Sequence, residues 1–309
     1  MTEAAPTMRT ILVFGAGGQV GFELLRTAWA DGLRPVGLAR AEGDVTDPAA
    51  VAAAMAAHRP ALVVNASAYT AVDKAESEPD RAFAVNRDGP ANLARACAGA
   101  GVPLIHISTD YVFDGTSKAD PWREDDPVAP QGVYAASKLA GEDAMRAILP
   151  DHVILRTAWV FGAHGHNFVK TMLRLARERD TLRVVADQRG CPTPAAGIAA
   201  AIAIMARARL TGGGWTPGVF HYAGAPATSW HGFAERIVER AASRIGRRPP
   251  VQAITTADFP TPARRPANSV LDTARIGQAY GIPPADWMTG LDRILDEILE
   301  QPQTVGASA

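Results

Sequence analysis

The chain has 309 residues, of which 47% are hydrophobic and 20% are charged, with a formal net charge of -1 and a pI near 6.7. This length allows one large domain or two modest ones. The near-neutral charge leaves no basic footprint for nucleic acid or an anionic membrane surface, so we expect any nucleotide that the protein binds to be small. Residues 1–8 lack a secretion signal, and the longest apolar run, residues 195–206, is too short to span a bilayer. We therefore expect a cytoplasmic protein without membrane contact.

A glycine turn follows the first predicted strand. Residues 10–14 are a compact apolar run and residues 22–25 have helical spacing, which predicts the start of a βαβ unit. Gly15 permits a tight turn, Gly18 lets the backbone approach a pyrophosphate, and Gly21 allows the helix to pack closely on the strand. The N-terminus of the helix would face the anion. The predicted dinucleotide site comprises Gly15, Gly17, Gly18, Gln19 and Val20.

The second predicted strand, residues 34–38, ends next to Arg40. NAD-preferring proteins often carry an acidic side chain about 20 residues past the glycines, whereas an Arg nearby accommodates the 2′-phosphate of NADP. Arg40 therefore favours NADPH, with NADH left open and a solvated loop arginine as the alternative. After a short strand-like approach, Asp44 and Val45 are expected to close over the adenine, and Asp47 to cap a helix over residues 49–57.

Residues 61–68 are predicted to form the fourth strand and to end in a turn of small side chains. At this turn Ala66, Ser67 and Ala68 would let the backbone lie against the cofactor. The polar loop of residues 70–76 follows at the C-terminal edge of the sheet, where α/β folds bind ligands. A helix cap with solvated charges is the alternative interpretation of this loop.

A predicted helix over residues 79–98 leads to a strand over residues 102–107, whose end delivers Thr109 beside the cofactor. Past a proline-rich loop, Tyr134 and Lys138 would share one face of a helix at about 5–6 Å between their Cβ atoms. An ammonium beside the phenol favours phenolate, so we expect Lys138 to lower the pKa of Tyr134 and make it a better proton donor. The Thr109 hydroxyl would hold the same substrate oxygen from the other side. A surface Tyr–Lys pair is the alternative unless other motifs agree.

Strands and helices alternate up to the sixth predicted strand, residues 153–157, which implies an α/β protein with a doubly wound parallel sheet of the Rossmann type. The less regular second half suggests a smaller C-terminal α/β substrate-binding domain. We expect the Rossmann domain to span 1–165 and to be rejoined by about 190–224, leaving 166–189 and 225–309 to the substrate-binding domain. Further predicted elements are strands at 182–186 and 218–222 and helices at 168–179, 195–208, 230–242 and 287–299, with Ser229 capping the third helix.

The glycine turn, residues 108–115 and the Tyr-x-x-x-Lys pair together resemble the extended short-chain dehydrogenase/reductase superfamily. Within it, the chain resembles the dTDP-4-dehydrorhamnose reductase family over nearly all of residues 10–300. The segments that carry this closer resemblance are residues 70–76, 156–160, 167–168, 229–231 and 264–269. Several separated motifs in one order are more specific than any of them alone.

The resemblance implies reduction of the C4 ketone of dTDP-4-dehydro-L-rhamnose by NADPH or NADH, the last step of dTDP-rhamnose biosynthesis. It implies that Tyr134 protonates the carbonyl oxygen, that Thr109 holds this oxygen, and that Lys138 binds the nicotinamide ribose. Tyr134 and Lys138 thereby also belong to the expected cofactor site. Arg265 suits a diphosphate because its planar fork binds two oxygens at once. The residues expected around the sugar nucleotide are Thr70, Val72, Asp73, Thr109, Tyr111, Trp159, Trp230, Arg265 and Asn268.

The chain departs from the family pattern at two kinds of position. Beside the catalytic tyrosine, Gly132 stands where Asn is usual and Ala135 where Gly is usual. Some members bind magnesium between subunits through glutamates, of which Glu23 and Glu297 match, but Ala196 stands at a third position. A hard cation would lose an oxygen ligand there, so we expect no intrinsic metal site and leave a homodimer open.

The cysteines and histidines suggest no other metal or disulfide chemistry. Cys97 and Cys191 form no C-x-x-C pair, which fits a reducing compartment. His164 and His166 have no family role that we can assign, and we expect them in an ordinary loop.

Two other functions stay open at this stage. One is another nucleotide-sugar 4-ketoreductase or epimerase of the same superfamily, which the three catalytic residues do not exclude. The other is a non-catalytic, NADP-binding regulatory subunit of a methionine adenosyltransferase. Thr109, Tyr134 and Lys138 argue against the regulatory subunit, because a pure binder needs no proton donor.

Overall fold

Six parallel strands form the central sheet of the computed structural model, which describes residues 8–300. These strands are β1 (Arg9–Phe14), β2 (Leu33–Leu38), β3 (Leu62–Asn65), β4 (Leu104–Thr109), β5 (His152–Thr157) and β10 (Gly218–His221). Their spatial order is β10-β5-β4-β3-β1-β2, so the direction of winding reverses between β1 and β3. At such a switch point, the C-terminal ends of the strands leave a crevice for a ligand.

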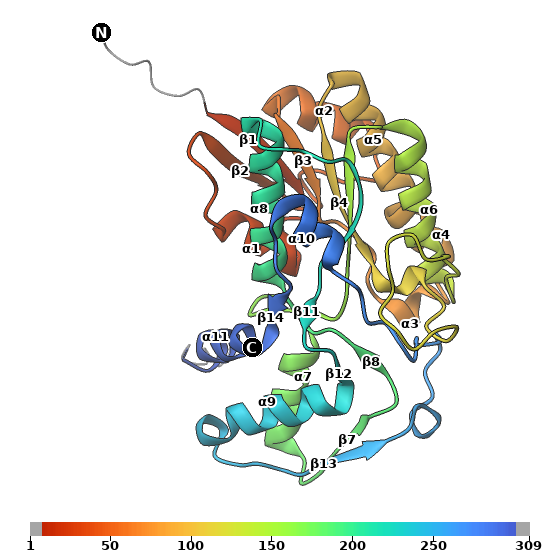
Figure 1. Cartoon of the computed structure of the whole chain (residues 1–309), viewed down its shortest axis with the longest axis vertical. Helices are drawn as coiled ribbons and strands as arrows, with labels where there is room; N and C mark the ends of the chain where they lie inside the picture. The colour runs from red at the N-terminus through yellow and green to blue at the C-terminus, as the bar shows by residue number, and fades with distance from the viewer. Residues whose placement is uncertain (1–7, 301–309) are drawn as a thin grey trace, which may run out of the picture.

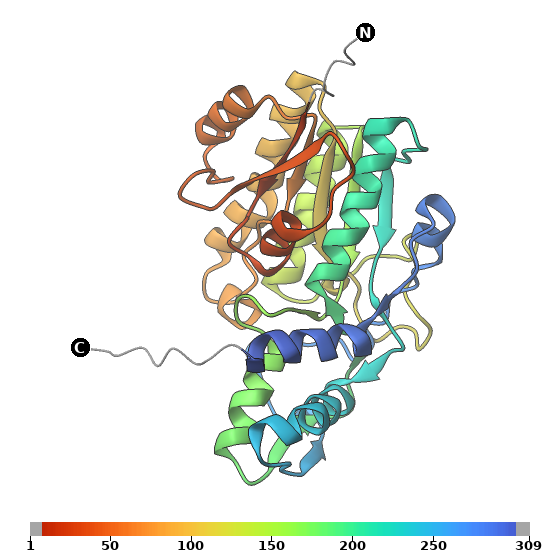
Figure 2. The ribbon, with the colours of Figure 1, turned by 90° about the vertical axis from the view of Figure 1, so that its left-hand side faces the viewer.

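Helices cover both faces of this sheet because its strands are apolar on both sides (Figures 1 and 2). One face carries α1 (Gln19–Arg26), α8 (Ala195–Thr211) and α10 (Ala274–Tyr280), and the other carries α2 (Pro48–His58), α5 (Gly89–Ala100) and α6 (Val133–Ile148). The two faces hold separate hydrophobic clusters. The doubly wound parallel sheet predicted from the sequence is confirmed.

A smaller body lies below the C-terminal edge of the sheet in Figure 1. It is built from α7 (Phe168–Glu178), α9 (Trp230–Ile245), α11 (Trp287–Glu300) and the parallel pair β7 (Leu182–Val185) and β13 (Val251–Ile254). Short two-stranded pairs connect the two bodies: β6 (Val160–Phe161) with β9 (Thr193–Pro194), β8 (Arg189–Gly190) with β12 (Thr228–Ser229), and β11 (Gly224–Ala225) with β14 (Ala285–Asp286). The exact division into two domains stays a proposal, although β10 pairs with β5 inside the central sheet.

The strand count expected from the sequence is too high by one. Residues 39–47 form turns instead of a short strand, so residues 62–65 are the third strand and residues 152–157 the fifth. Side chains take the hydrogen bonds that a strand would need: the Glu42 carboxylate accepts from the N–H of Ala39 at 2.9 Å. Such local bonds compete with a sheet ladder.

The single helix expected over residues 79–98 is interrupted. It is α4 (Pro79–Phe83), then a π-helical turn η1 (Ala84–Asp88), then α5. Pro90 lacks an N–H to continue the ladder, and Asn86 at the widened turn bonds both backbone groups of Tyr69 and the Ser137 hydroxyl. The loop expected at residues 70–76 also contains one helical turn, α3 (Val72–Ala75).

Two predicted helix caps are confirmed. Asp47 accepts a hydrogen bond from the N–H of Ala49 at 2.8 Å at the start of α2. Ser229 accepts one from the N–H of Gly232 at 3.0 Å at the start of α9.

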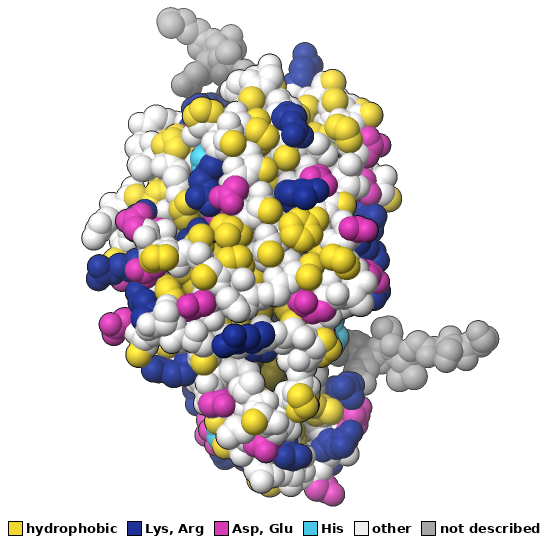
Figure 3. Space-filling view, turned by 90° about the vertical axis from the view of Figure 1, so that its right-hand side faces the viewer, with side chains coloured by type: hydrophobic (Ala, Val, Ile, Leu, Met, Phe, Trp, Pro, Cys, Tyr) yellow, Lys and Arg dark blue, Asp and Glu magenta, His cyan; other side chains and the backbone are white. Residues whose placement is uncertain are grey.

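The part of the surface in Figure 3 mixes charges of both signs with apolar atoms and shows no single-sign cluster. Among residues 8–300, no helix combines the length and the apolar character needed to cross a bilayer.

Candidate active site

The C-terminal ends of the central strands open into two adjoining cavities. The larger has a volume of about 630 Å³ and the smaller a volume of about 290 Å³. Gly17, Gly18, Ala66, Ser67 and Ala68 line both of them. A ligand that passes over the glycine turn can therefore reach into both cavities.

The glycine turn depends on two close approaches of the backbone. Gly15 has a φ of +83°, and a Cβ there would lie 2.5 Å from the backbone nitrogen of Ser67. A Cβ on Gly21 would lie 2.1 Å from the carbonyl oxygen of Gly15. Gly18 begins α1 without a side-chain cap, so the N–H groups of the first helical turn border the cavities. This arrangement fits the diphosphate of a dinucleotide.

The structure brings all of the sequence-predicted cofactor residues to the two cavities. Gly15, Arg40, Asp44 and Val45 line the smaller cavity, and Gln19, Val20, Tyr134 and Lys138 line the larger one. The turn residues shared by both cavities complete the set. The smaller cavity therefore suits an adenosine phosphate, and the larger one suits a nicotinamide.

Arg40 lies at the mouth of the smaller cavity. Its Nε donates to Asp44 Oδ2 at 3.1 Å, and hydrogen bonds from Thr46 lower the pKa of Asp44. Arg81, which was not predicted, lines the same cavity, and its guanidinium lies 5.6 Å from the centre of the Tyr69 ring. Two arginines therefore line the smaller cavity.

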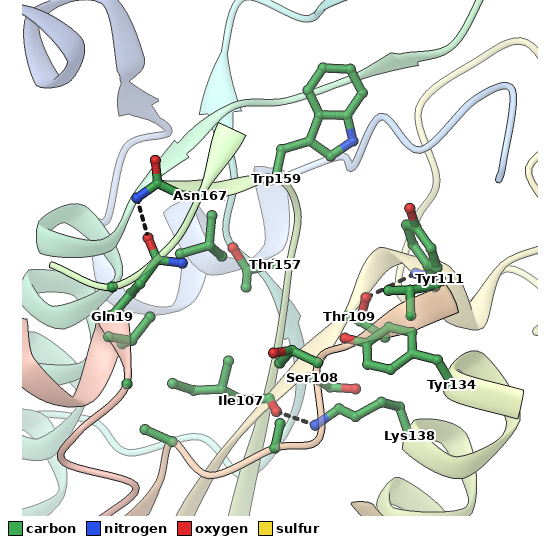
Figure 4. Close-up of a pocket in the computed structure, with 18 of the residues that line it drawn as sticks. Gln19, Ile107, Ser108, Thr109, Tyr111, Tyr134, Lys138, Thr157, Trp159 and Asn167 are labelled. Carbon is green, nitrogen blue, oxygen red and sulfur yellow. Dashed lines mark hydrogen bonds between the residues drawn. The ribbon is translucent and has the colours of Figure 1, made fainter. Parts of the chain in front are cut away.

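Thr109, Tyr134 and Lys138 lie together in the larger cavity (Figure 4). Lys138 Nζ donates to the carbonyl oxygen of Ile107 at 2.7 Å and lies 3.3 Å from His106 Nε2. Thr109 ends β4, whereas Tyr134 and Lys138 project from the start of α6. The helix spacing predicted from the sequence thus directs both side chains into the cavity.

The expected lowering of the Tyr134 pKa is wrong for this structure. Burial raises the pKa of Tyr134 to about 12, and the Thr109 hydroxyl opposes this shift only in part. Burial also lowers the pKa of Lys138 to about 8, against the opposing effect of the Glu142 carboxylate. Desolvation therefore dominates both shifts: the Asp110 charge acts in the same direction on Tyr134, and the Glu142 charge is outweighed at Lys138. The raised pKa keeps Tyr134 protonated at neutral pH, as a proton donor must be.

The helix that carries Tyr134 is capped from another segment. Glu76 Oε1 accepts a hydrogen bond from the N–H of Val133 at 2.8 Å. Gly132 has a φ of +85°, and a Cβ there would lie 2.6 Å from the same carboxylate oxygen. Gly132, where the family usually has Asn, is therefore the residue that lets Glu76 support the catalytic helix.

A buried ion pair, not predicted from the sequence, fixes α6 against the sheet. Glu142 accepts from Arg156 Nε at 3.0 Å and Nη2 at 2.7 Å, and from the Ser108 hydroxyl at 2.6 Å. The side chains of Arg156 and Glu142 are 2% and 0% exposed. Glu142 lies four residues after Lys138 on the same helix, but residue spacing gave no signal for its pairing with Arg156 on β5.

A second buried chain of polar groups joins the turn after β3 to the catalytic lysine. Asn65 Oδ1 accepts from the N–H of Ser67 at 3.0 Å, and Asn65 Nδ2 lies 3.0 Å from His106 Nδ1. His106 contacts Lys138 on its other side. These contacts therefore hold the turn after β3 and the Lys138 side chain, which both line the larger cavity, in a fixed relation to each other.

Six of the nine predicted substrate residues line the larger cavity: Thr70, Val72, Thr109, Tyr111, Trp159 and Trp230. The Trp159 and Trp230 rings stack with their centroids 3.5 Å apart and 7° between their planes. Trp159 has a φ of 45°, unusual for a bulky residue. A Cβ on Gly190 would lie 2.3 Å from the Trp159 ring, so this strained residue depends on a glycine beneath it.

The other three, Asp73, Arg265 and Asn268, do not belong to the lining of that cavity. Arg265 Nη2 donates to Asp73 Oδ2 at 2.6 Å, while its buried Nη1 has no partner among the described residues. The charges of Arg265 and Asp73 both influence the pKa of Tyr111. Because Tyr111 lines the larger cavity, this ion pair lies beside that cavity. The Asn268 amide donates to carbonyl oxygens of residues 118–120. The Asn268 amide thus holds this loop, and substrate binding by Asn268 stays a prediction.

The segment before α7 closes over the glycine turn. Asn167 Nδ2 donates to Gln19 Oε1 at 3.0 Å (Figure 4), and His164 Nε2 lies 3.1 Å from the carbonyl oxygen of Gly17. His166 lines the larger cavity. The expectation of an ordinary loop for both histidines is therefore incomplete. The sequence signal that could have indicated this closing segment was the family motif that contains Asn167.

The glutamates that match a magnesium site do not fit a divalent cation. Glu23, Glu297 and Ala196 line one groove between α1, α8 and α11. Arg26 Nη1 lies 2.8 Å from Glu297 Oε1 and 3.8 Å from Glu23 Oε1, so a guanidinium already lies beside both carboxylates. Ala196 supplies no oxygen ligand.

Comparison with known proteins agrees with this geometry. A family model described as the RmlD substrate binding domain matches residues 8–300. A dTDP-4-dehydrorhamnose reductase from Sinorhizobium fredii is 44% identical over 290 residues, which cover 94% of this chain and 97% of that protein. A crystal structure of dTDP-4-dehydrorhamnose reductase from Bacillus anthracis in complex with NADP has a TM-score of 0.86 at 32% identity and covers 94% and 100% of the two chains. One from Clostridium acetobutylicum has a TM-score of 0.85 at 36% identity and covers 94% and 99%.

Proposed function

Because the chain belongs to the RmlD family of dTDP-4-dehydrorhamnose reductases, we propose that it reduces the C4 ketone of dTDP-4-dehydro-L-rhamnose to dTDP-L-rhamnose with NADPH. The observation that supports this best is the larger cavity, which holds Thr109, Tyr134 and Lys138 next to the glycine turn. When bound, NADPH supplies the hydride that adds to the ketone carbon.

The protein's own residues handle the proton and the developing charge. The Tyr134 hydroxyl donates its proton to the ketone oxygen as that oxygen becomes negative, and with a pKa of about 12 the phenol carries this proton at neutral pH. Lys138, whose pKa is about 8, is mostly charged at neutral pH, and its ammonium in the same cavity would bind the nicotinamide ribose. The stacked Trp159 and Trp230 rings offer an apolar wall for the sugar nucleotide.

The test follows the near-ultraviolet absorbance of NADPH on mixing with enzymatically prepared dTDP-4-dehydrorhamnose. The wild-type protein should consume NADPH. Tyr134→Phe should lose roughly 10²- to 10⁴-fold in turnover, because the proton donor is gone. Its NADPH affinity, measured by cofactor fluorescence, should stay nearly unchanged. A wild-type rate in Tyr134→Phe would show that the acid is another group.

The same assay separates the alternative functions. A regulatory subunit would quench NADPH fluorescence without consuming NADPH, and an epimerase would convert the sugar without net oxidation of the cofactor. No feature of residues 8–300 specifically favours either one.

Location and assembly are also proposals. The free thiols of Cys97 and Cys191 suit the reducing cytoplasm. A homodimer would have the groove between α1, α8 and α11 as its natural contact, since Ile204 there is 44% exposed. Sedimentation of the purified protein would reveal whether it is a monomer or a dimer.

A further inference from the structure

Asp110 is a buried carboxyl group that the proposed mechanism does not use. It begins the 3-10 helix η2 (Asp110–Val112), lines the larger cavity and is 3% exposed. Its Oδ1 accepts a hydrogen bond from the Thr109 hydroxyl at 3.0 Å. Its Oδ2 is buried and has no partner among the described residues. Since buried polar atoms are normally paired, this oxygen calls for an explanation.

The hydroxyl of Thr109 has one hydrogen and two lone pairs. Its hydrogen is directed to Asp110 Oδ1, and one lone pair accepts the N–H of Tyr111 at 3.2 Å. While Asp110 is ionised, Thr109 therefore cannot donate to an oxygen in the cavity. It can then only accept, for instance from the Tyr134 phenol that should be protonating the substrate.

We propose that Asp110 is a positioning residue of the reduction: its protonated carboxyl donates to Thr109 Oγ1, which frees the Thr109 hydrogen to turn toward the ketone oxygen. This inference rests on the proposed function. The proton that ends on the product still comes from Tyr134, and the proton on Asp110 stays where it is. Ionisation of Asp110 draws the Thr109 hydrogen back and weakens the hold on the reacting oxygen.

The surroundings of Asp110 place its pKa in the neutral range, so its carboxyl can change protonation state near pH 7. Burial raises the pKa of Asp110 to about 7, and the hydroxyls of Thr109 and Ser269 oppose the shift only in part. The titratable groups that feel its charge are Tyr111, Tyr134 and Cys191. All three have raised pKa values and are uncharged at neutral pH. Charged side chains act on these neighbours of Asp110: Arg265 and Asp73, which pair with each other, act on Tyr111, and Arg189 acts on Cys191.

The sign of the pH effect follows directly. The protonated, productive form of Asp110 predominates below about pH 7, and it is lost as the pH rises through that value. The pKa of Lys138 is about one unit higher, near 8, so deprotonation of Lys138 gives a second, separate decline in turnover. At saturating NADPH and substrate, turnover of the wild type should therefore fall first across pH 7.

The decisive variant is Asp110→Asn, which has nearly the same shape but cannot ionise. Its turnover should stay within roughly tenfold of the wild type at about pH 6 and should lose the decline across pH 7, leaving only the decline of Lys138. Its NADPH affinity should not change. A decline at the same pH as in the wild type would overturn the proposal.

Ser269→Ala is the matched control. It removes a hydroxyl that donates to the carbonyl oxygen of Arg189 at 3.2 Å and also lowers the pKa of Asp110, but it leaves Thr109 and the carboxyl in place. The decline should persist and move to higher pH. A profile identical to that of the wild type would contradict the assignment of the decline to Asp110.

Thr109 variants keep the proposal testable if Asp110→Asn does not fold. Thr109→Ser retains the hydroxyl and should retain the decline, whereas Thr109→Val should turn over slowly with no decline across pH 7. Persistence of the decline in Thr109→Val would overturn the inference. If the wild type consumes no NADPH with this substrate at any pH, the proposed function itself is wrong, and the inference falls with it.

Discussion

The two ends of the cleft are built in different ways. The cofactor end centres on two short turns directly after β1 and β3, where close approaches between the backbones fix its shape, and residues 40–45 after β2 complete it. The substrate end is assembled from side chains that are far apart in sequence. Its ion pair joins Asp73 and Arg265 across 192 positions, and its stacked rings come from Trp159 and Trp230.

This difference implies that the two ends respond separately to substitution. Substitutions at the turns should change the affinity for the cofactor. Substitutions in the pairs of residues that are far apart in sequence should change the affinity for the sugar nucleotide. Only the buried Glu142–Arg156 pair, which holds the catalytic helix against β4 and β5, should affect both. Four experiments test this separation.

Glu142→Ala should have the largest effect. It leaves the Arg156 guanidinium buried without its partner, which should lower the free energy of unfolding by about 3–5 kcal/mol. Urea denaturation would measure the change. Asp143→Ala is the control on the same helix, because this side chain is 65% exposed and should change stability by only about 0.5 kcal/mol. Equal effects of the two variants would contradict the role of the pair.

Arg265→Ala should act at the substrate end alone. Loss of a charged donor for the diphosphate should raise KM for the sugar nucleotide roughly tenfold to a hundredfold, with NADPH affinity unchanged. Arg264→Ala is the matched control, because its exposed neighbouring side chain does not pair with Asp73. Steady-state kinetics would show the difference, and a similar KM in both variants would reject Arg265 as the diphosphate ligand.

Arg40→Ala should act at the cofactor end alone. Because Arg40 is exposed, the loss should be smaller, about tenfold in NADPH affinity, with NADH affinity nearly unchanged. Fluorescence titration with each cofactor would measure this. Arg34→Ala, an exposed arginine on β2 outside both cavities, should leave both affinities intact. An equal loss for NADH would mean that Arg40 does not read the 2′-phosphate.

Removal of divalent metal should affect neither end. Arg26 already lies between the Glu23 and Glu297 carboxylates, so dialysis against EDTA should leave turnover and the melting temperature unchanged. Activity that is lost on dialysis and restored by magnesium would show that a cation displaces Arg26.

The substrate end could be predicted only in part. Trp159 and Trp230 belong to recognisable motifs and do line the cavity, but nothing in the sequence shows that their rings stack. Asn268 also belongs to a motif, yet its amide holds the loop of residues 118–120. Whether a polar side chain faces a ligand or a neighbouring loop depends on which segments pack around it.

The sequence by itself determined the glycine turn, the helix face shared by Tyr134 and Lys138, and the position of Arg40, because residue types and their spacing within one short segment indicate each of them. The tertiary structure decided the protonation chemistry. Burial by distant segments raises the pKa of Tyr134 and Asp110 and lowers that of Lys138, against the sequence-based expectation for the tyrosine. Desolvation depends on every atom packed around a group, so residue spacing along the chain cannot reveal it.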